Sequence, residues 1–225
     1  MKLNNFNRQI DDIGARWPWL LDHMERVGMF VYALGREYEV SRDDLERLYM
    51  AGFLHGLGEY GVRVFQRCAE ADEQAVRRAA AAWPVVASSM ILMVPGFEYV
   101  ARVVGQCGEN FDGSGEPFGA RCMQIHVFAA MIRVADIYDT CRLDGASHDA
   151  AAAELRRLSD VAVPKRLITP FLKNIVSNED LRFDYAELRQ RRAEAEQALD
   201  EQYTSTQARL DEMEREREQM IIRTR

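Results

Sequence analysis

Apolar residues recur at helical spacing along most of this chain, and that periodicity limits its fold more than any other feature. Between Leu20 and Tyr38, six apolar side chains follow the three- and four-residue steps that place them on one face of a helix: Leu20, Leu21, Met24, Val27, Val31 and Leu34. Nothing in the sequence alternates with period two over a useful length. We therefore predict an all-α fold.

Local signals divide the rest of the chain into further helices. Ser41, followed by acidic residues, is typical of an N-cap and predicts a helix that runs towards His55. Residues 75–93 are rich in alanine and other apolar residues, and residues 123–138 form an apolar run of helical length. Residues 147–158 predict another short helix, which begins at a serine.

Residues 105–120 interrupt this pattern with five glycines. Glycine adopts backbone angles that other residues avoid, so a cluster of glycines between helical segments predicts a loop of unusual conformation.

Residues 185–225 form a segment of different composition, without proline or glycine and rich in Glu, Arg, Gln and Ala. A seam with steps of three and four and one break runs along it: Leu188, Arg192, Ala195 and Leu199, then Tyr203, Thr206, Leu210, Met213, Arg217 and Met220. Arg192, Thr206 and Arg217 weaken the apolar character of this seam. One interpretation is a single solvated helix supported by pairs such as Asp211–Arg215. We favour a coiled coil or bundle with a second copy, because a lone helix would expose Leu199, Leu210, Met213, Met220, Ile221 and Ile222. We therefore predict a homodimer, with residues 1–180 as the main domain and residues 181–225 as the dimerisation segment.

Composition excludes several classes of function. The 225 residues, 48% of them hydrophobic, suffice for one substantial core. The net charge of −7 argues against a nucleic-acid-binding surface. No apolar run approaches the roughly 20 residues of a membrane span, and the N-terminus lacks the apolar core of a secretory signal. The four cysteines have no metal-binding spacing and are expected to be reduced thiols. We expect a cytoplasmic protein.

Four short segments together carry a resemblance to a known family. Residues 23–27 read His-Met-Glu-Arg-Val, residues 54–59 read Leu-His-Gly-Leu-Gly-Glu, residues 111–117 read Phe-Asp-Gly-Ser-Gly-Glu-Pro, and residues 134–139 read Val-Ala-Asp-Ile-Tyr-Asp. From about residue 20 to residue 175 the chain resembles the HD-GYP domains, the HD-superfamily phosphodiesterases of cyclic-di-GMP. The resemblance implies a helical bundle in which histidine and carboxylate ligands hold two or three divalent metals that activate water.

The chain departs from this family at several of the implied ligand positions. Gly56 stands where the family has the aspartate that bridges the metals, and Glu59 stands where it has a lysine that faces phosphate. Trp83 replaces the histidine of a His-Pro pair, and Cys107-Gly108 replaces a tandem histidine pair.

Of the matched ligand positions, only His23, His55 and Asp136 remain. We interpret both histidines as hydrogen-bonded core residues. Asp136 either pairs with His55 across the former cleft or forms a salt bridge, for example with Arg133. Because dispersed ligands cannot hold a metal centre, we predict that the chain binds no metal or other cofactor and is not an enzyme. A replacement metal site at Cys122 and His126 is a weaker alternative.

The glycine-rich loop is better preserved than the metal ligands. It matches the family at Asp112, Gly113, Ser114, Gly115 and Pro117, and only Glu116 departs. In the family this loop is linked to the docking of diguanylate-cyclase (GGDEF) domains, so the resemblance implies a protein-binding role. Glycines also let backbone N–H groups point outward towards an anion or a carbonyl group. The alternative is that the glycines serve folding alone.

These observations predict an inactive bacterial signalling or scaffold protein that acts through protein–protein contact, with a GGDEF domain as a possible partner class. The first alternative is a sensor that binds cyclic-di-GMP without cleaving it, for which Arg102, Arg121 and Arg133 are the candidate phosphate contacts. The second alternative is a residual metal-dependent phosphodiesterase.

Overall fold

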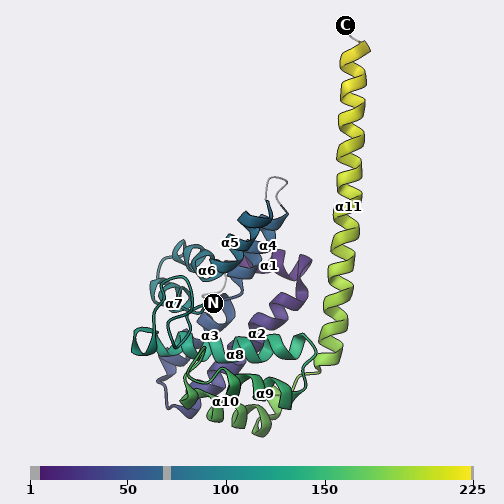
Figure 1. The fold of residues 1–225 in the computed structure, drawn as a ribbon. Helices are drawn as coiled ribbons and strands as arrows, with labels where there is room; N and C mark the ends of the chain where they lie inside the picture. The colour runs from purple at the N-terminus through teal and green to yellow at the C-terminus, as the bar shows by residue number, and fades with distance from the viewer. Residues whose placement is uncertain (1–5, 68–71, 224–225) are drawn as a thin grey trace.

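The computed structural model describes residues 6–67 and 72–223, although the side chains of several residues beyond position 206 are not described. Within these ranges the protein consists of helices and loops, with one isolated β-bridge between Ser159 and Val163 (Figure 1). The prediction of an all-α fold is confirmed. No helix in the described ranges has the length and apolar character needed to cross a membrane.

The first half of the chain contains α1 (Asn7–Arg16), α2 (Pro18–Glu37), α3 (Arg42–Leu54) and α4 (Leu57–Gln66). Helix α2 is the predicted apolar helix, and its buried stripe includes every residue of the predicted stripe except the half-buried Leu21. Ser41 caps α3 by accepting a hydrogen bond from the Asp44 amide, as its position in the sequence predicts. Helices α2 and α3 cross closely at Gly52, and the glycine permits this because a Cβ atom there would collide with Val31.

Three short helices follow, α5 (Glu73–Ala81), α6 (Trp83–Leu92) and α7 (Glu98–Val104). The alanine-rich stretch is thus two helices, because Pro84 lies in the first turn of α6, where its missing N–H group costs no hydrogen bond. The predicted loop follows α7 and reaches a 3-10 turn, η2 (Cys122–Gln124).

The second half contains α8 (Val127–Leu143), α9 (His148–Arg157), α10 (Lys165–Ser177), the 3-10 turn η3 (Glu179–Leu181) and α11 (Tyr185–Arg223). Helix α8 begins later than its apolar pattern suggests, because His126 caps it with its own ring by accepting a hydrogen bond from the Phe128 amide. Ser147 caps α9 as predicted.

The core lies where α2, α8 and α10 meet. The ring of Phe30 on α2 packs edge-on against Tyr138 of α8 and Phe171 of α10, with centroids 5.8 and 5.7 Å apart. This packing fixes the face of α2 that points at α8, and the same face carries the polar residues described below.

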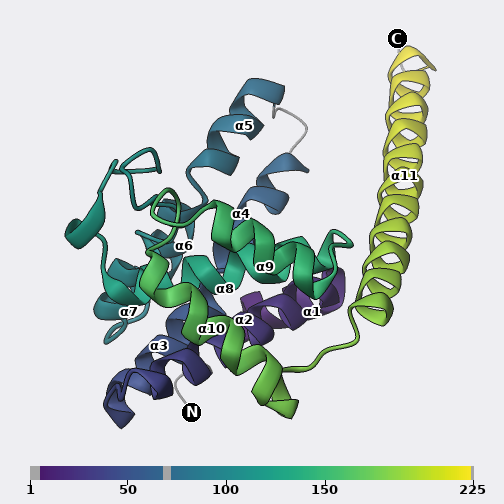
Figure 2. The same cartoon turned by 60° about the horizontal axis from the view of Figure 1, so that its bottom comes forward.

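Helix α11 differs in its two parts. Its first turns lie against the body, where Ala195 and Leu199 pack on the core. Its later turns extend away from the body, as Figures 1 and 2 both show. Of the apolar residues expected to be exposed on a lone helix, Leu199 is half-buried and Met213 is 62% exposed. The side chains of Leu210, Met220, Ile221 and Ile222 lie outside the described residues.

Candidate metal centre

Three side chains from three helices converge on one point between α2, α3 and α8. His23 projects from α2, His55 ends α3, and Asp136 projects from α8. The Nε2 atoms of the two histidines lie 3.1 Å apart. Asp136 Oδ1 lies 3.5 Å from the Nε2 atom of His23 and 3.7 Å from that of His55. The three surviving positions are therefore not dispersed, as the sequence suggested, but adjacent.

The second nitrogen of each histidine is held on the opposite side of its ring. His23 Nδ1 donates a hydrogen bond to Asp139 Oδ2 over 2.7 Å, and His55 Nδ1 donates to the carbonyl of Gly52. Both rings therefore turn Nε2 towards Asp136. Metal-binding histidines in proteins are held in this way, with the other ring N–H donated to a carboxylate or a backbone carbonyl.

Asp139 is the buried anchor of this arrangement, with none of its surface exposed. Its Oδ1 accepts a hydrogen bond from Arg26 Nε (2.8 Å) and another from the Tyr185 hydroxyl (2.6 Å). Its Oδ2 accepts from Arg26 Nη2 (2.8 Å) in addition to His23. Burial would raise the pKa of Asp139, but the bonds and charges of His23 and Arg26 outweigh burial and lower this pKa to about 2.

The charges at the point of convergence depend on one another. Burial alone would lower the pKa of His23, but hydrogen bonds and charge attraction from Asp136 and Asp139 raise this pKa to about 10. Burial would raise the pKa of Asp136, but His23 and His55 hold it well below its usual range. In the metal-free protein His23 is therefore a cation, and its proton offsets the repulsion between the facing acceptor atoms.

The donor set and its spacing fit one divalent metal ion. Two imidazole nitrogens and one carboxylate oxygen are the ligands of many catalytic zinc and iron sites, which keep further positions open for water or substrate. Ligand atoms about 2.1 Å from a tetrahedral ion lie roughly 3.4 Å apart. The observed separations of 3.1, 3.5 and 3.7 Å bracket that value. No other group of three or more potential ligands meets among the described residues.

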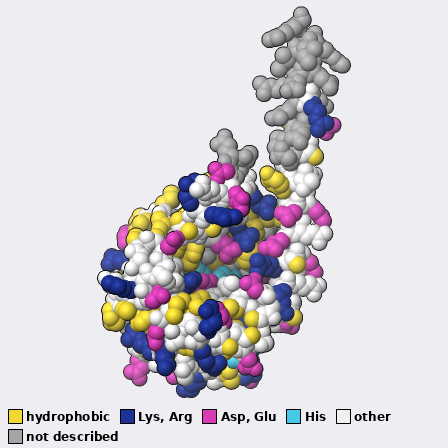
Figure 3. Space-filling view, in the orientation of Figure 1, with side chains coloured by type: hydrophobic (Ala, Val, Ile, Leu, Met, Phe, Trp, Pro, Cys, Tyr) yellow, Lys and Arg dark blue, Asp and Glu magenta, His cyan; other side chains and the backbone are white. Residues whose placement is uncertain are grey.

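A cavity of about 220 Å³ opens onto these three residues. Figure 3 shows histidine surface at the bottom of a hollow on this face, with charged side chains around it. The wall is formed by Gly56, Glu59 and Trp83, among others. Glu59 forms a salt bridge with Arg63 (2.8 Å), so its negative charge is partly balanced.

The positions that depart from the family pattern are filled by packing. A Cβ atom at Gly56 would run into the side chain of Met24, so the space beside this glycine is occupied. The ring of Trp83 lies edge-on to His55, with centroids 6.0 Å apart. Cys107 is buried, and burial raises the pKa of its thiol well above the usual range, which keeps the thiol protonated.

The alternative site at Cys122 and His126 does not form. The two residues precede α8, so they do not share a helical face. Both ring nitrogens of His126 have other partners, the Tyr99 hydroxyl and the Phe128 amide.

The glycine-rich loop is folded around a buried carboxylate. Glu109, 2% exposed, accepts hydrogen bonds from the amides of Phe118 (2.7 Å) and Ala120 (2.8 Å). The amide of Ser114 donates to Asp112, and that of Glu116 donates to the carbonyl of Gly108. These four N–H groups bond within the protein, which gives the loop a structural role. Its proposed binding of a GGDEF domain stays a prediction.

The three arginines named for a nucleotide sensor do not line the cavity. Arg133 lies near Asp136, with Nη1 and Oδ2 3.7 Å apart, and Arg102 and Arg121 are exposed. A nucleotide sensor requires basic side chains within the cleft, and these three arginines do not supply them.

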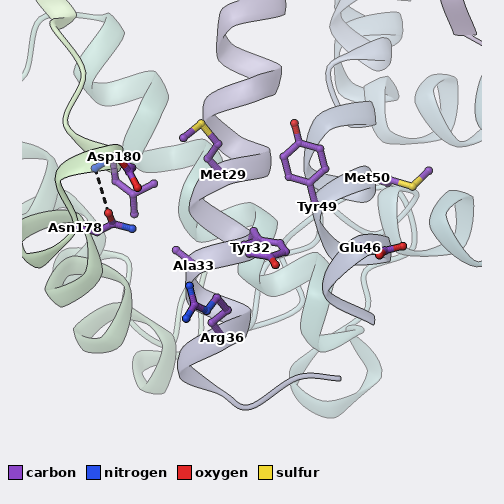
Figure 4. Close-up of a pocket in the computed structure, with 10 residues that line it drawn as sticks. Met29, Tyr32, Ala33, Arg36, Glu46, Tyr49, Met50, Asn178 and Asp180 are labelled. Carbon is purple, nitrogen blue, oxygen red and sulfur yellow. Dashed lines mark hydrogen bonds between the residues drawn. The ribbon is translucent and has the colours of Figure 1, made fainter. Parts of the chain in front are cut away.

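A larger groove of about 760 Å³ lies on a different face of α2, between α3 and η3 (Figure 4). Met29 and Tyr32 line it from α2, Tyr49 and Met50 from α3, and Leu181 from η3. The groove contains none of the three converging residues, so its size does not make it the site of the chemistry.

Arg26, Asp139 and Tyr185 are the members of this centre to which the sequence assigned no role. Arg26 and Asp139 lie inside the quoted segments 23–27 and 134–139, three residues after His23 and Asp136 on the same helical faces. That spacing was a usable signal. Tyr185 had none, because it belongs to the segment assigned to dimerisation.

Comparisons with known proteins show the family and the fold of the chain. A family model described as an HD domain matches residues 8–169. A curated relative, the 3′3′-cGAMP-specific phosphodiesterase 3 of Vibrio cholerae serotype O1, is 30% identical over 129 residues, which are 56% of this chain and 28% of the relative. The crystal structure of a cyclic GMP-AMP specific phosphodiesterase from V. cholerae has the same fold, with a TM-score of 0.56 at 16% identity. That match covers 71% of this chain and 44% of the other. The matched regions span less than half the length of each of the two V. cholerae proteins.

These findings contradict the prediction that the chain is not an enzyme. A homologous protein is a phosphodiesterase, and the three ligands that were judged too dispersed form a cluster that can hold a metal. The error has a physical cause, because spacing along the chain does not show which helical faces meet.

Proposed function

Because the chain belongs to the HD-domain family, we propose that it is a metal-dependent phosphodiesterase acting on a cyclic dinucleotide, with one divalent ion held by His23, His55 and Asp136. The observation that carries this proposal is the pair of Nε2 atoms turned towards Asp136, each held from behind at Nδ1. Two histidines that served only to fill the core would not need to turn their Nε2 atoms towards the same carboxylate. The substrate class is supported by the relative that cleaves 3′3′-cGAMP.

A bound divalent ion would lower the pKa of water and neutralise the charge of a phosphodiester. The chain supplies the rest. Asp139 accepts the hydrogen bond of His23 Nδ1 and the Gly52 carbonyl accepts that of His55 Nδ1, so that each ring turns its Nε2 towards the cavity. Trp83 and Gly56 form part of the cavity wall against which a phosphodiester would lie. Arg133 does not line the cavity, but it lies 3.7 Å from Asp136 with its side chain 26% exposed, and it is our candidate cation for a non-bridging phosphate oxygen.

The cavity is too small for a whole dinucleotide. Its volume of about 220 Å³ falls below the roughly 300–1,000 Å³ of pockets that enclose drug-sized ligands. One phosphodiester group fits, and the bases would then lie across the surface around the opening. We therefore expect selectivity among dinucleotides to come from residues outside the cavity.

The test is metal loading followed by hydrolysis. Protein stripped with a chelator is reconstituted with Mn²⁺, Fe²⁺ or Zn²⁺ and assayed for cleavage of 3′3′-cGAMP and cyclic-di-GMP, with His55→Ala as the control. We expect about one metal per chain and cleavage that His55→Ala abolishes. A wild-type protein that takes up no metal would refute the proposal, and binding of dinucleotide without cleavage would favour a sensor.

We also propose that α11 beyond Tyr203 pairs with a second copy of the chain. The support is the projection of this part from the body and the exposure of Tyr203 (46%) and Met213 (62%) on it. The homodimer is tested by truncation, as described in the Discussion.

A further inference from the structure

The buried carboxylate of Asp139 binds a residue from the long C-terminal helix. Its hydrogen-bond donors come from two elements, since His23 and Arg26 lie on α2 and Tyr185 lies in the first turn of α11. Tyr185 is 4% exposed, so its hydroxyl has left water and depends on this bond. The bond, at 2.6 Å, has the length expected when a hydroxyl donates to a carboxylate.

The first turns of α11 make further contacts with the body on both sides of this bond. Arg142 of α8 stacks on the ring of Tyr185, 4.3 Å from its centroid, and its carbonyl accepts a hydrogen bond from Arg189 (3.1 Å). On the α2 side, Arg191 pairs with Asp22 (3.3 Å). The start of α11, with Tyr185, is therefore placed by contacts with α8 and α2, two of the three helices that carry the centre.

Further along, α11 also reaches the wall of the cavity. Arg192 lies over one side of the Trp19 ring, and Arg63 lies within 4.6 Å of the same ring's centroid. Arg63 in turn pairs with Glu59, which lines the cavity. The docked part of α11 thus bonds to Asp139 directly, and its Glu196 lies 3.9 Å from Arg63, the partner of Glu59.

We propose that Tyr185 is a positioning residue of the metal centre, so that docking of α11 sets the orientation in which His23 offers Nε2. This inference rests on the proposed function. Asp139 uses Oδ1 for Tyr185 and Arg26, and Oδ2 for His23 and Arg26. The tyrosine hydroxyl therefore opposes rotation of the carboxylate about its Cβ–Cγ bond. A carboxylate held in this way fixes the plane of the His23 ring, which decides how well Nε2 meets a metal.

The substitution Tyr185→Phe isolates the hydroxyl, because the ring that packs against Arg142 is kept. The same helix supplies a matched control, Tyr203→Phe. Tyr203 is 46% exposed and lies beside Arg67, away from the metal centre. Circular dichroism and thermal melting establish that both variants are folded.

The first measurement is Co²⁺ binding by titration and by visible absorption, which reports coordination geometry without an activity assay. We expect Tyr185→Phe to weaken Co²⁺ binding about tenfold or more and to alter the absorption bands, since loss of a residue that supports a ligand typically lowers metal affinity 10–100-fold. Tyr203→Phe should stay within about twofold of wild type. A Tyr185→Phe protein with wild-type affinity and spectrum would overturn the inference.

The second measurement separates this inference from the proposed function. The chain has four histidines, so the imidazole ¹⁵N signals of the metal-free protein can be assigned with a His23→Gln reference. Tyr185→Phe should shift the His23 signals, and Tyr203→Phe should not. If wild-type protein binds no Co²⁺, the proposed function fails by itself, and this shift alone decides whether Tyr185 positions His23. Unchanged His23 signals would refute the inference.

Discussion

The two sides of the metal centre are built in different ways. On the side of α2 and α8, buried charged groups satisfy one another: His23, Arg26 and Tyr185 all donate to Asp139. On the side of α4 and α6, the wall is apolar packing and a partly exposed ion pair, with Met24 against Gly56 and Glu59 bound to Arg63.

From this difference we expect substitutions on the two sides to have different costs for the fold. A buried charge that loses its partner remains in a medium that solvates it poorly, so substitution on the α8 side is costly. On the α4 side, a ligand can be replaced by a smaller residue if a neighbour fills the space, as Met24 does. The candidate metal centre thus has its three potential ligands anchored from the charged side, while the positions at which the chain departs from the HD-GYP pattern lie on the packed side.

The largest expected effect is on the charged side. Asp139→Asn leaves the buried Arg26 without its carboxylate, so we expect the free energy of unfolding to fall by about 3–5 kcal/mol. The matching change on the packed side, Glu59→Gln, removes a partly exposed ion pair and should cost about 0–1 kcal/mol. Urea denaturation of both variants measures the difference, and equal losses would contradict the contrast drawn between the two sides.

A second prediction concerns the restoration of a lost ligand. Gly56→Asp should destabilise the protein by about 1–3 kcal/mol and add no second metal, because the new side chain collides with Met24. The double variant Gly56→Asp/Met24→Ala shortens the side chain that collides, and it should recover part of the lost free energy of unfolding. Denaturation and metal analysis check both. A single Gly56→Asp variant that is fully stable and binds two metals would show that the packed side is not closed.

A third prediction concerns pH. The pKa of His23 is about 10 in the metal-free fold and 6.5 in an unfolded chain, so its contribution to stability is complete below pH 6.5 and is lost as pH rises through 10. Metal binding must displace the same proton, so apparent affinity should rise by about tenfold per pH unit between pH 7 and 9. Titration calorimetry in buffers of different ionisation enthalpy measures the released proton. Affinity that does not change with pH would contradict a protonated His23.

The smallest effect on stability is expected far from the centre. Truncation after Tyr203 keeps the docked turns of α11 and should change unfolding and metal affinity by less than the experimental error. It should nevertheless convert the proposed dimer to a monomer, as sedimentation velocity would show. A truncated protein that is still dimeric would place the dimer contact on the body instead.

The sequence predicted the helices that carry clear local signals, such as α2, α3 and α9. Ser41 and Ser147 cap the helices that follow them, and the apolar stripe of α2 faces the core. The start of α8 was placed too early, because apolar periodicity does not show that His126 uses its own ring as a cap.

The sequence identified the three potential metal ligands but not their convergence or the residues that hold them. His23, His55 and Asp136 were identified, and the suggested pairing of Asp136 with His55 is present at 3.7 Å. Their meeting with His23 depends on how α2 and α8 dock, which local patterns do not encode. The bond from Tyr185 joins residues 46 apart in the chain, and only the docking of α11 brings them together.

The packing of Met24 beside Gly56 also has a consequence for the evolutionary paths open to the protein. A single mutation that returned an acidic residue to position 56 would meet an occupied space, and a single mutation that shortened Met24 would leave a cavity. We expect each step alone to lower the free energy of unfolding, and the two together to cost less than the sum of the single costs. An acidic residue at position 56 is therefore accessible only together with a change at Met24, so that these two positions are expected to vary as a pair rather than one at a time.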